Sequence, residues 1–275
     1  MSSIKIMALG GVRENGKNLY IAEVNEQIFV LDAGAKYPEN EQLGVDVVVP
    51  NFDYLEENKH RVAGVFLTHG HADSIGALPY LLEKVKVPVF GSHLTIELAK
   101  LIVKNNNSTK KFNDFHIINA ETEIDFGDSV VSFFKTTHSI PESLGIVVKT
   151  DQGNIVYTGD FKFDQAADKF YRTDFGRLAE IGSEGVLALL SDSANADSNV
   201  QSASMHEESE EILNTIADCE GRVIVAAVAS NIVRIQQIFN AAEATGRRVV
   251  LTGHDVENIV RTAIQLKKLR LVSER

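Results

Sequence analysis

The chain has 275 residues, of which 44% are hydrophobic, so it can bury the core of one large domain or of two smaller ones. Its single cysteine excludes an internal disulfide and fits a reducing cytoplasm, and no apolar run of about 18 residues predicts a membrane span. The net charge of −11 at pH 7 disfavours a nucleic-acid-binding protein, although divalent metal ions would reverse the local field of an acidic site.

The first part of the chain consists mainly of strand-like segments. We expect strands at residues 4–8, 19–24, 27–31, 63–67, 115–119, 129–136, 144–150 and 154–158. Helices are predicted at residues 75–84, where Ile75, Leu78 and Leu81 share an apolar face, and at residues 94–105. A run of strands with helices outside it indicates two packed sheets with helices on both outer faces.

The pattern changes after about Ala188, where strands and helices begin to alternate. Helices are predicted at residues 206–218, 232–245 and 255–269, with strands at residues 222–227 and 248–251. Such alternation is typical of a parallel sheet with helical crossovers. We therefore expect two units, residues 1–187 and residues 188–275.

A compact polar motif follows the predicted strand at residues 63–67. It contains His69, His71 and Asp73, which stand two residues apart on a loop before a helix. Imidazole and carboxylate groups suit zinc, manganese or iron, and the lack of further cysteines excludes a thiolate cage. His138 and Asp160 also follow predicted strands. Taken alone, His138 fits an ordinary loop residue and Asp160 a turn former beside Gly159, but together the residues predict a metal site.

These motifs resemble the metallo-β-lactamase superfamily and, more closely, the ribonuclease J family, whose core carries an inserted β-CASP domain. The resemblance covers nearly the whole chain and depends on residues 10–12, 16–18, 31–34, 43–46, 69–80, 137–141, 159–164, 191–193 and 229–231. It implies an α/β fold in which an αββα metallo-β-lactamase sandwich is followed by the first part of an α/β β-CASP domain. It also implies that the chain is the N-terminal part of a longer protein.

The resemblance assigns roles to the motif residues. His69, His71 and His138 would hold one metal ion, Asp73 would hold a second, and Asp160 would bridge the two. Asp73 and Asp160 would be the catalytic carboxylates of a metal-dependent ribonuclease. The implied substrate is RNA, cut internally and from its 5′ end during RNA processing and decay.

Several positions depart from the family pattern. Ala72 and Ser74 stand where the family has glutamate and histidine, Met205 replaces a glutamate, and Val233 replaces a common histidine. The pattern is similar to the second, degenerate ribonuclease J paralogue that some bacteria carry beside an active one. Because serine is a poor neutral ligand, we expect one zinc or manganese ion or weak occupancy, and weak or absent activity.

Two alternatives to an active ribonuclease stay open. The first is a non-catalytic subunit that binds and supports an active ribonuclease J paralogue in a hetero-oligomer. The second is a small-molecule hydrolase of the same superfamily, such as a thioesterase, against which the β-CASP-like segments argue.

Polar residues at strand ends in the second unit are candidates for binding RNA phosphate. They are Ser191, Ser193, Ser230 and Asn231, where the serine hydroxyls and the backbone amides suit a phosphate group. A serine–asparagine pair after a strand is also a common helix cap, so both interpretations stay open for Ser230 and Asn231.

Overall fold

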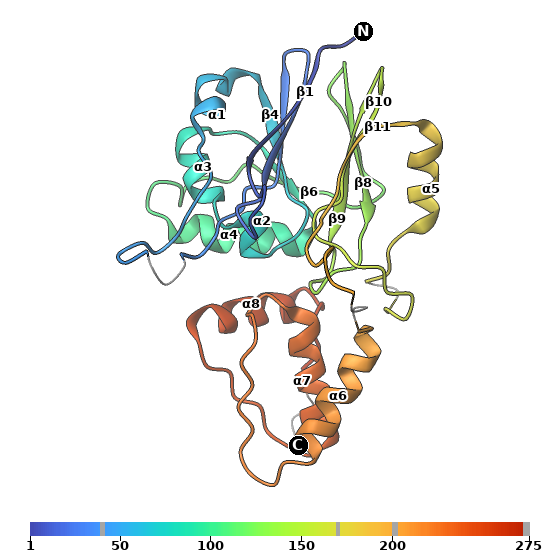
Figure 1. The fold of residues 1–275 in the computed structure, drawn as a ribbon. Coiled ribbons are helices and arrows are strands. Elements are labelled where there is room, and N and C mark those ends of the chain that lie inside the picture. The colour runs from blue at the N-terminus through green and yellow to red at the C-terminus, as the bar shows by residue number, and fades with distance from the viewer. Residues whose placement is uncertain (39–41, 169–170, 200–202, 272–275) are drawn as a thin grey trace.

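The computed structural model describes residues 1–38, 42–168, 171–199 and 203–271, and its two sheets pack face to face with helices on both outer sides (Figure 1). The first sheet has the order β1-β2-β3-β4-β5-β6. Its strands are β1 (Ile4–Gly10), β2 (Leu19–Val24), β3 (Gln27–Leu31), β4 (Val62–Phe66), β5 (Val89–Gly91) and β6 (Phe115–Ile117). The second sheet has the order β11-β10-β9-β8-β7. Its strands are β7 (Glu123–Asp125), β8 (Val130–Lys135), β9 (Leu144–Thr150), β10 (Gly153–Tyr157) and β11 (Val186–Leu190).

Helices cover the outer faces of both sheets, as expected for the αββα sandwich. The first sheet is covered by α1 (Asp53–Glu57), the short 3-10 helix η1 (Lys59–Arg61), α2 (Ala72–Ile75), α3 (Leu78–Lys84) and α4 (His93–Asn105). The second sheet is covered by α5 (Phe175–Glu184), which packs through Ile181 on Phe134, Val147 and Val156. No helix in these ranges is long and apolar enough to cross a membrane.

A core rich in phenylalanine joins the two sheets. Phe66 of β4 stacks on Phe90 with ring centroids 4.8 Å apart and contacts Phe133 of the second sheet at 6.4 Å. Phe29, Phe66 and Phe133 are each at most 1% exposed. Burying one such side chain contributes about 1.5–3 kcal/mol, so β4 is firmly anchored in the sandwich. The loop that follows β4 therefore starts from a fixed point.

The predicted helix at residues 75–84 is wrong in one respect, because the structure divides it into α2 and α3. The carbonyl of Asp73 accepts a hydrogen bond from the Asn18 amide at 3.0 Å instead of from a helical partner. The Ala77 amide in turn donates to Ala33 at 2.8 Å. Contacts with Asn18, directly before β2, and with the loop after β3 thus take over the backbone groups that would have continued the helix.

The last part of the chain forms a helical lobe, residues 203–271, at the lower end of the sandwich (Figure 1). It contains α6 (Met205–Ala217), α7 (Ile232–Ala244) and α8 (His254–Gln265). The predicted helices are confirmed within a few residues. Ile232, Ile235 and Val260 of this lobe join the core that also holds Leu94 and Leu98 of α4. The division between residues 187 and 188 stays a prediction.

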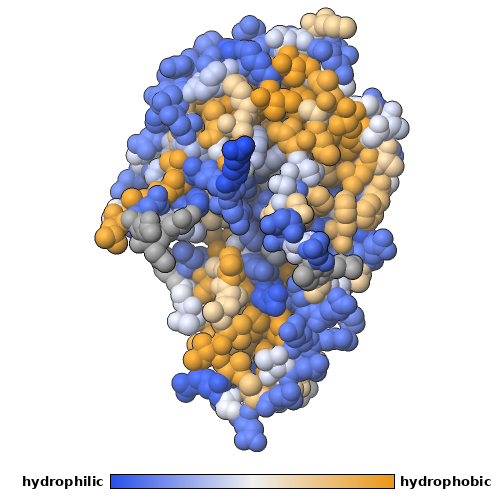
Figure 2. All heavy atoms as spheres, viewed as in Figure 1, coloured by the Kyte–Doolittle hydropathy of each residue, from blue (hydrophilic) through white to orange (hydrophobic). Residues whose placement is uncertain are grey.

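The strands predicted at residues 222–227 and 248–251 are wrong, because neither segment pairs in a sheet with any described residue. Both segments line an apolar cavity of about 630 Å³ against α7. Some of their side chains are nevertheless largely exposed: Ile224 is 88% and Val250 is 86% exposed. Figure 2 shows apolar side chains gathered on this lobe. Valine and isoleucine favour strands, but a strand forms only where a neighbour satisfies its backbone groups.

Candidate metal centre

The ligand candidates of three separate strands meet at one end of the sandwich. His69, His71 and Asp73 follow β4, His138 follows β8, and Asp160 follows β10. The three histidine rings lie with centroids 4.6–4.9 Å apart. Two groups have ligand atoms within 4.8 Å of one another, namely the three histidines, and His69 with both aspartates. The structure thus brings together the five residues that the motifs singled out.

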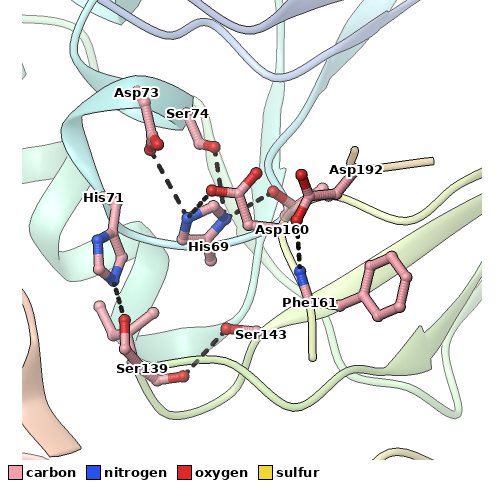
Figure 3. Close-up of polar contacts among 12 residues, drawn as sticks. His69, His71, Asp73, Ser74, Ser139, Ser143, Asp160, Phe161 and Asp192 are labelled. Atoms are coloured by element: carbon pink, nitrogen blue, oxygen red, sulfur yellow. Dashed lines mark hydrogen bonds and ion pairs between the residues drawn. The ribbon is translucent and has the colours of Figure 1, made fainter. Parts of the chain in front are cut away.

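His69 lies at the centre of this arrangement (Figure 3). Its Nε2 atom is 3.7 Å from Oδ1 of Asp73 and 3.9 Å from Oδ2 of Asp160. Both distances are too long for a direct hydrogen bond. Within the described residues, Nε2 of His69 and Oδ1 of Asp73 are buried without a hydrogen-bond partner. A cation between these atoms would satisfy both, so the donor set fits a divalent metal ion.

The opposite nitrogen of His69 is oriented by a buried hydrogen-bond chain. The Thr68 hydroxyl donates to Oδ2 of Asp32 at 2.8 Å and lies 2.9 Å from Nδ1 of His69. Because the hydroxyl hydrogen is used by Asp32, the hydroxyl accepts the Nδ1–H of His69. Tyr157 also donates to Asp32, at 2.9 Å, and burial raises the pKa of Asp32 to about 7. This chain leaves the Nε2 lone pair of His69 directed at the metal position.

The electrostatics of the pocket favour a bound cation. Burial lowers the pKa of His71 to about 3 and that of His138 to about 4, and it lowers the pKa of His69 well below its usual value. The imidazoles are therefore neutral, which is the form that binds metals. Burial and the neighbouring Asp73 raise the pKa of Asp160 to about 8, and burial raises that of Asp73. The raised pKa values show that the negative charges of Asp73 and Asp160 are not compensated, so a bound cation would be favourable there.

Two glycines allow the backbone to approach the ligands closely. A Cβ atom on Gly34 would lie 1.5 Å from the Asp73 carbonyl oxygen, so no other residue fits there. Gly159 has a φ of +58°, and its Cβ would lie 2.7 Å from Cβ of Thr68. The absence of a side chain at these two positions therefore allows the loops that carry Asp73 and Asp160 to pack closely.

Ser74 is fully buried, but its hydroxyl contacts Nδ1 of His69, whereas the two aspartates lie near Nε2. Its Oγ is 3.4 Å from Nδ1 of His69 (Figure 3), the nitrogen that the Thr68 hydroxyl also contacts at 2.9 Å. Ala72, the other departure in this motif, begins α2, and its carbonyl accepts from the Ala35 amide at 2.9 Å. The hydroxyl of Ser74 thus contacts the His69 nitrogen opposite Nε2, and the loss of a metal ligand at this position stays a prediction.

The other two departures lie together in an apolar cluster. Met205 of α6 and Val233 of α7 are 9% and 8% exposed and pack with Ala167 and Tyr171. The Val233 amide also donates to the Ser139 carbonyl at 3.1 Å. These side chains connect the helical lobe to the loops that follow Asp160 and His138.

The phosphate candidates fall into two groups. Ser230 places its hydroxyl 3.4 Å from Nδ1 of His71, whose Nε2 is 3.3 Å from the hydroxyl of Ser139. The Asn231 side chain accepts from the Arg234 amide at 2.9 Å and so caps α7. Ser191 and Ser193 are exposed after β11. Their contact with phosphate stays a prediction.

Asp192 is a further residue of the site, which the sequence motifs did not identify. Its Oδ2 accepts from the Phe161 amide at 3.4 Å, and Figure 3 shows it beside Asp160. Its negative charge helps to raise the pKa of both Asp73 and Asp160. The available signal was its place directly after the β11 segment, which matches the place of Asp160 after β10.

Residues 12–205 match the family described as the metallo-beta-lactamase superfamily. The chain belongs to the metallo-β-lactamase superfamily. Residues 220–274 match a second family, described as the ribonuclease J beta-CASP domain. Together the two matches confirm the resemblance to ribonuclease J that the motifs indicated.

Curated members of the superfamily share high identity with the whole chain. It is 70% identical to Ribonuclease J 2 of Streptococcus pyogenes serotype M3 over 275 residues, which are 100% of this chain and 50% of that protein. It is 47% identical to Ribonuclease J2 of Bacillus subtilis strain 168 over 264 residues, which are 96% of this chain and 47% of that protein. The chain thus spans about half the length of these relatives. A crystallised Enterococcus faecalis V583 protein of unknown function has the same fold, with a TM-score of 0.70. The two chains are 15% identical, and the match covers 98% of this chain and 69% of that one.

Proposed function

We propose that the protein is a ribonuclease J-like hydrolase of RNA phosphodiesters in cytoplasmic RNA processing and decay, acting endonucleolytically and from a 5′ end. The observation that carries this proposal is the cluster of three neutral imidazoles and two carboxylates around the unpartnered Nε2 of His69. The identity of the relatives named Ribonuclease J 2 supports it.

The residues of the cluster suit phosphodiester hydrolysis. A divalent ion, zinc or manganese, would supply Lewis-acid activation of the phosphate and of the attacking water. His69, His71 and His138 would hold it, with Asp160 as a further ligand. When water attacks phosphorus and the P–O bond breaks, the carboxylate of Asp73 or that of Asp160 takes the proton of the water. The leaving oxygen then receives a proton from the protonated acid or from solvent.

We propose that turnover is weak because Ser74 supplies no second-site ligand. Its hydroxyl lies at Nδ1 of His69, so the second position keeps only carboxylates and a shared imidazole. Each 1.4 kcal/mol of lost transition-state stabilisation lowers the rate about tenfold. We expect one ion per chain and a slow reaction.

A second candidate is a non-catalytic subunit that supports an active ribonuclease J paralogue in a hetero-oligomer. The packing of Met205 and Val233 with Ala167 and Tyr171 favours it, because an apolar cluster fills a place where the active family pattern carries polar groups. In this case RNA would reach the paralogue, and Ser191, Ser193, Ser230 and Asn231 would at most hold phosphate.

Degradation of a 5′-monophosphorylated RNA separates the two candidates. The purified protein is incubated with the RNA and manganese, beside a His71→Ala variant and an EDTA control. Slow cleavage that disappears with His71→Ala supports the enzyme. Cleavage no greater than that of His71→Ala, together with co-elution with an active paralogue, supports the subunit.

A further inference from the structure

Three phenylalanine rings form a continuous aromatic surface beside the metal centre. The ring centroids of Phe161 and Phe163 lie 5.1 Å apart, and those of Phe163 and Phe175 lie 5.3 Å apart. Phe163 is 63% and Phe175 is 45% exposed. Adjacent exposed aromatic rings offer flat faces on which a planar ligand can stack.

The backbone holds these rings rigidly next to the metal ligands. Phe163 is three residues after Asp160, so their Cα atoms are at most about 11 Å apart. The Lys162 amide between the two donates to the Thr137 carbonyl at 2.9 Å. Thr137 and Thr173 in turn exchange amide-to-hydroxyl hydrogen bonds, each 3.0 Å long. The loops carrying Phe163 and Phe175 are thus fixed to the strand end that carries His138.

The surface has the size of one or two bases and is too small for a protein interface. A phenylalanine buries about 150–250 Å² when it is covered, so the exposed parts of Phe163 and Phe175 add up to roughly 200 Å². A stable protein–protein contact needs about 800 Å² per partner. Nucleic-acid bases, by contrast, stack singly on exposed aromatic rings.

A polar cavity of about 690 Å³ adjoins Phe163. It is also lined by Lys162, Gln165 and Ser204, and by the carboxylates Asp164 and Glu207. Lys162 lies between two of the rings in sequence, and its Nζ atom is 3.7 Å from Oδ2 of Asp164 and donates to the Ala203 carbonyl at 3.2 Å. An aromatic face next to amide and hydroxyl groups suits a base with its sugar.

We propose that Phe161, Phe163 and Phe175 form a stacking platform for the bases of a single-stranded nucleic acid whose backbone passes the metal centre. This inference rests on the proposed RNA function and adds to it the place where bases flanking the phosphodiester are held. Since every base has a π-face, the platform binds without sequence preference.

The test is the affinity of the protein for a 3′-fluorescein-labelled, 5′-monophosphorylated oligoadenylate, measured by fluorescence anisotropy in EDTA so that no cleavage occurs. Phe163→Ala and Phe163→Leu remove the π-face, and the leucine keeps apolar area. We expect both to weaken binding at least about fivefold, and Phe163→Trp to retain it. Tyr80→Ala, on the exposed side of α3, serves as the matched control and should bind like the wild type.

The outcomes separate the platform from the proposed function. If the wild type binds and Phe163→Ala binds equally well, the platform is overturned while RNA binding stands. If Phe163→Leu binds like the wild type, the rings provide only apolar contact, and the proposal is also overturned. A wild type that binds no oligoadenylate overturns the platform, and the proposed hydrolase is then tested separately by the cleavage assay with manganese. If Phe163→Ala keeps its RNA affinity but lowers the assembly mass in light scattering, the rings belong to a protein interface.

Discussion

Replacing Thr68 by valine should weaken both the fold and the metal centre. The Thr68 hydroxyl links Asp32 to His69 through contacts of 2.8 and 2.9 Å, and Thr68 is 1% exposed. Valine keeps the branched shape but removes one hydrogen bond to a carboxylate and one to an imidazole. The two bonds together contribute roughly 2–4 kcal/mol. At about 2–4 °C per kcal/mol for a chain of this size, we expect Tm to fall by roughly 4–16 °C.

The same substitution frees the His69 ring, whose Nδ1 then has only the longer contact to Ser74 at 3.4 Å. Loss of such an orienting partner lowers metal affinity by about 10–100-fold. Scanning calorimetry in EDTA gives the stability, and a zinc titration gives the affinity. Thr68→Ser keeps the hydroxyl and is the control. A valine variant with wild-type Tm and zinc affinity would refute the role of the Asp32–Thr68–His69 chain.

Three further predictions concern the departures from the family pattern and the pH dependence. Ser74→His should raise the manganese content toward two ions per chain and RNA turnover at least about tenfold; an unchanged metal content would show that another feature limits the site. Met205→Glu should cost about 1–3 kcal/mol in urea unfolding, because it places a charge among Ala167, Tyr171 and Val233, whereas Met205→Leu should be nearly neutral; equal stability of the two variants would argue against a packed cluster. In metal-free protein, the pKa of Asp160 is raised to about 8 and that of Asp32 to about 7, so the stability that these carboxyls contribute at low pH is lost as pH rises through those values. The pKa of His71 is lowered to about 3 and that of His138 to about 4, so both stabilise the fold above the usual histidine pKa. Beyond about pH 7.5 their contribution to the unfolding free energy no longer changes with pH. The unfolding free energy in EDTA should therefore fall between about pH 7.5 and 9, and Asp160→Asn should reduce that fall; a rising stability would contradict the assigned direction of the shift.

The sandwich could be predicted because its local signals agree with its tertiary contacts. The segments of β2, β3 and β9 have the predicted bounds, and buried residues such as Phe29 and Ile146 occupy their inner faces. The failures have tertiary causes. The break between α2 and α3 depends on Asn18 and Ala33, which are far away in sequence. The segments at residues 222–227 and 248–251 have strand-like composition but no neighbouring strand in the described ranges.

The metal centre could be located from the sequence because strand-end residues in one αββα sandwich meet at one edge. The motifs identified His69, His71, Asp73, His138 and Asp160, which the structure brings together. They did not identify Asp32, whose role depends on the hydroxyl of Thr68, or Asp192, which acts through its charge. Both effects depend on burial and distance, which spacing along the chain does not encode.

The most direct test of the metal-centre assignment is the metal content of the purified protein by mass spectrometry, with His71→Ala beside it. The structure predicts one zinc or manganese ion per chain, lost in His71→Ala, because three neutral imidazoles surround one position and Ser74 supplies no further ligand. A wild-type protein that retains no divalent ion, or that retains two ions unaffected by His71→Ala, would contradict this assignment.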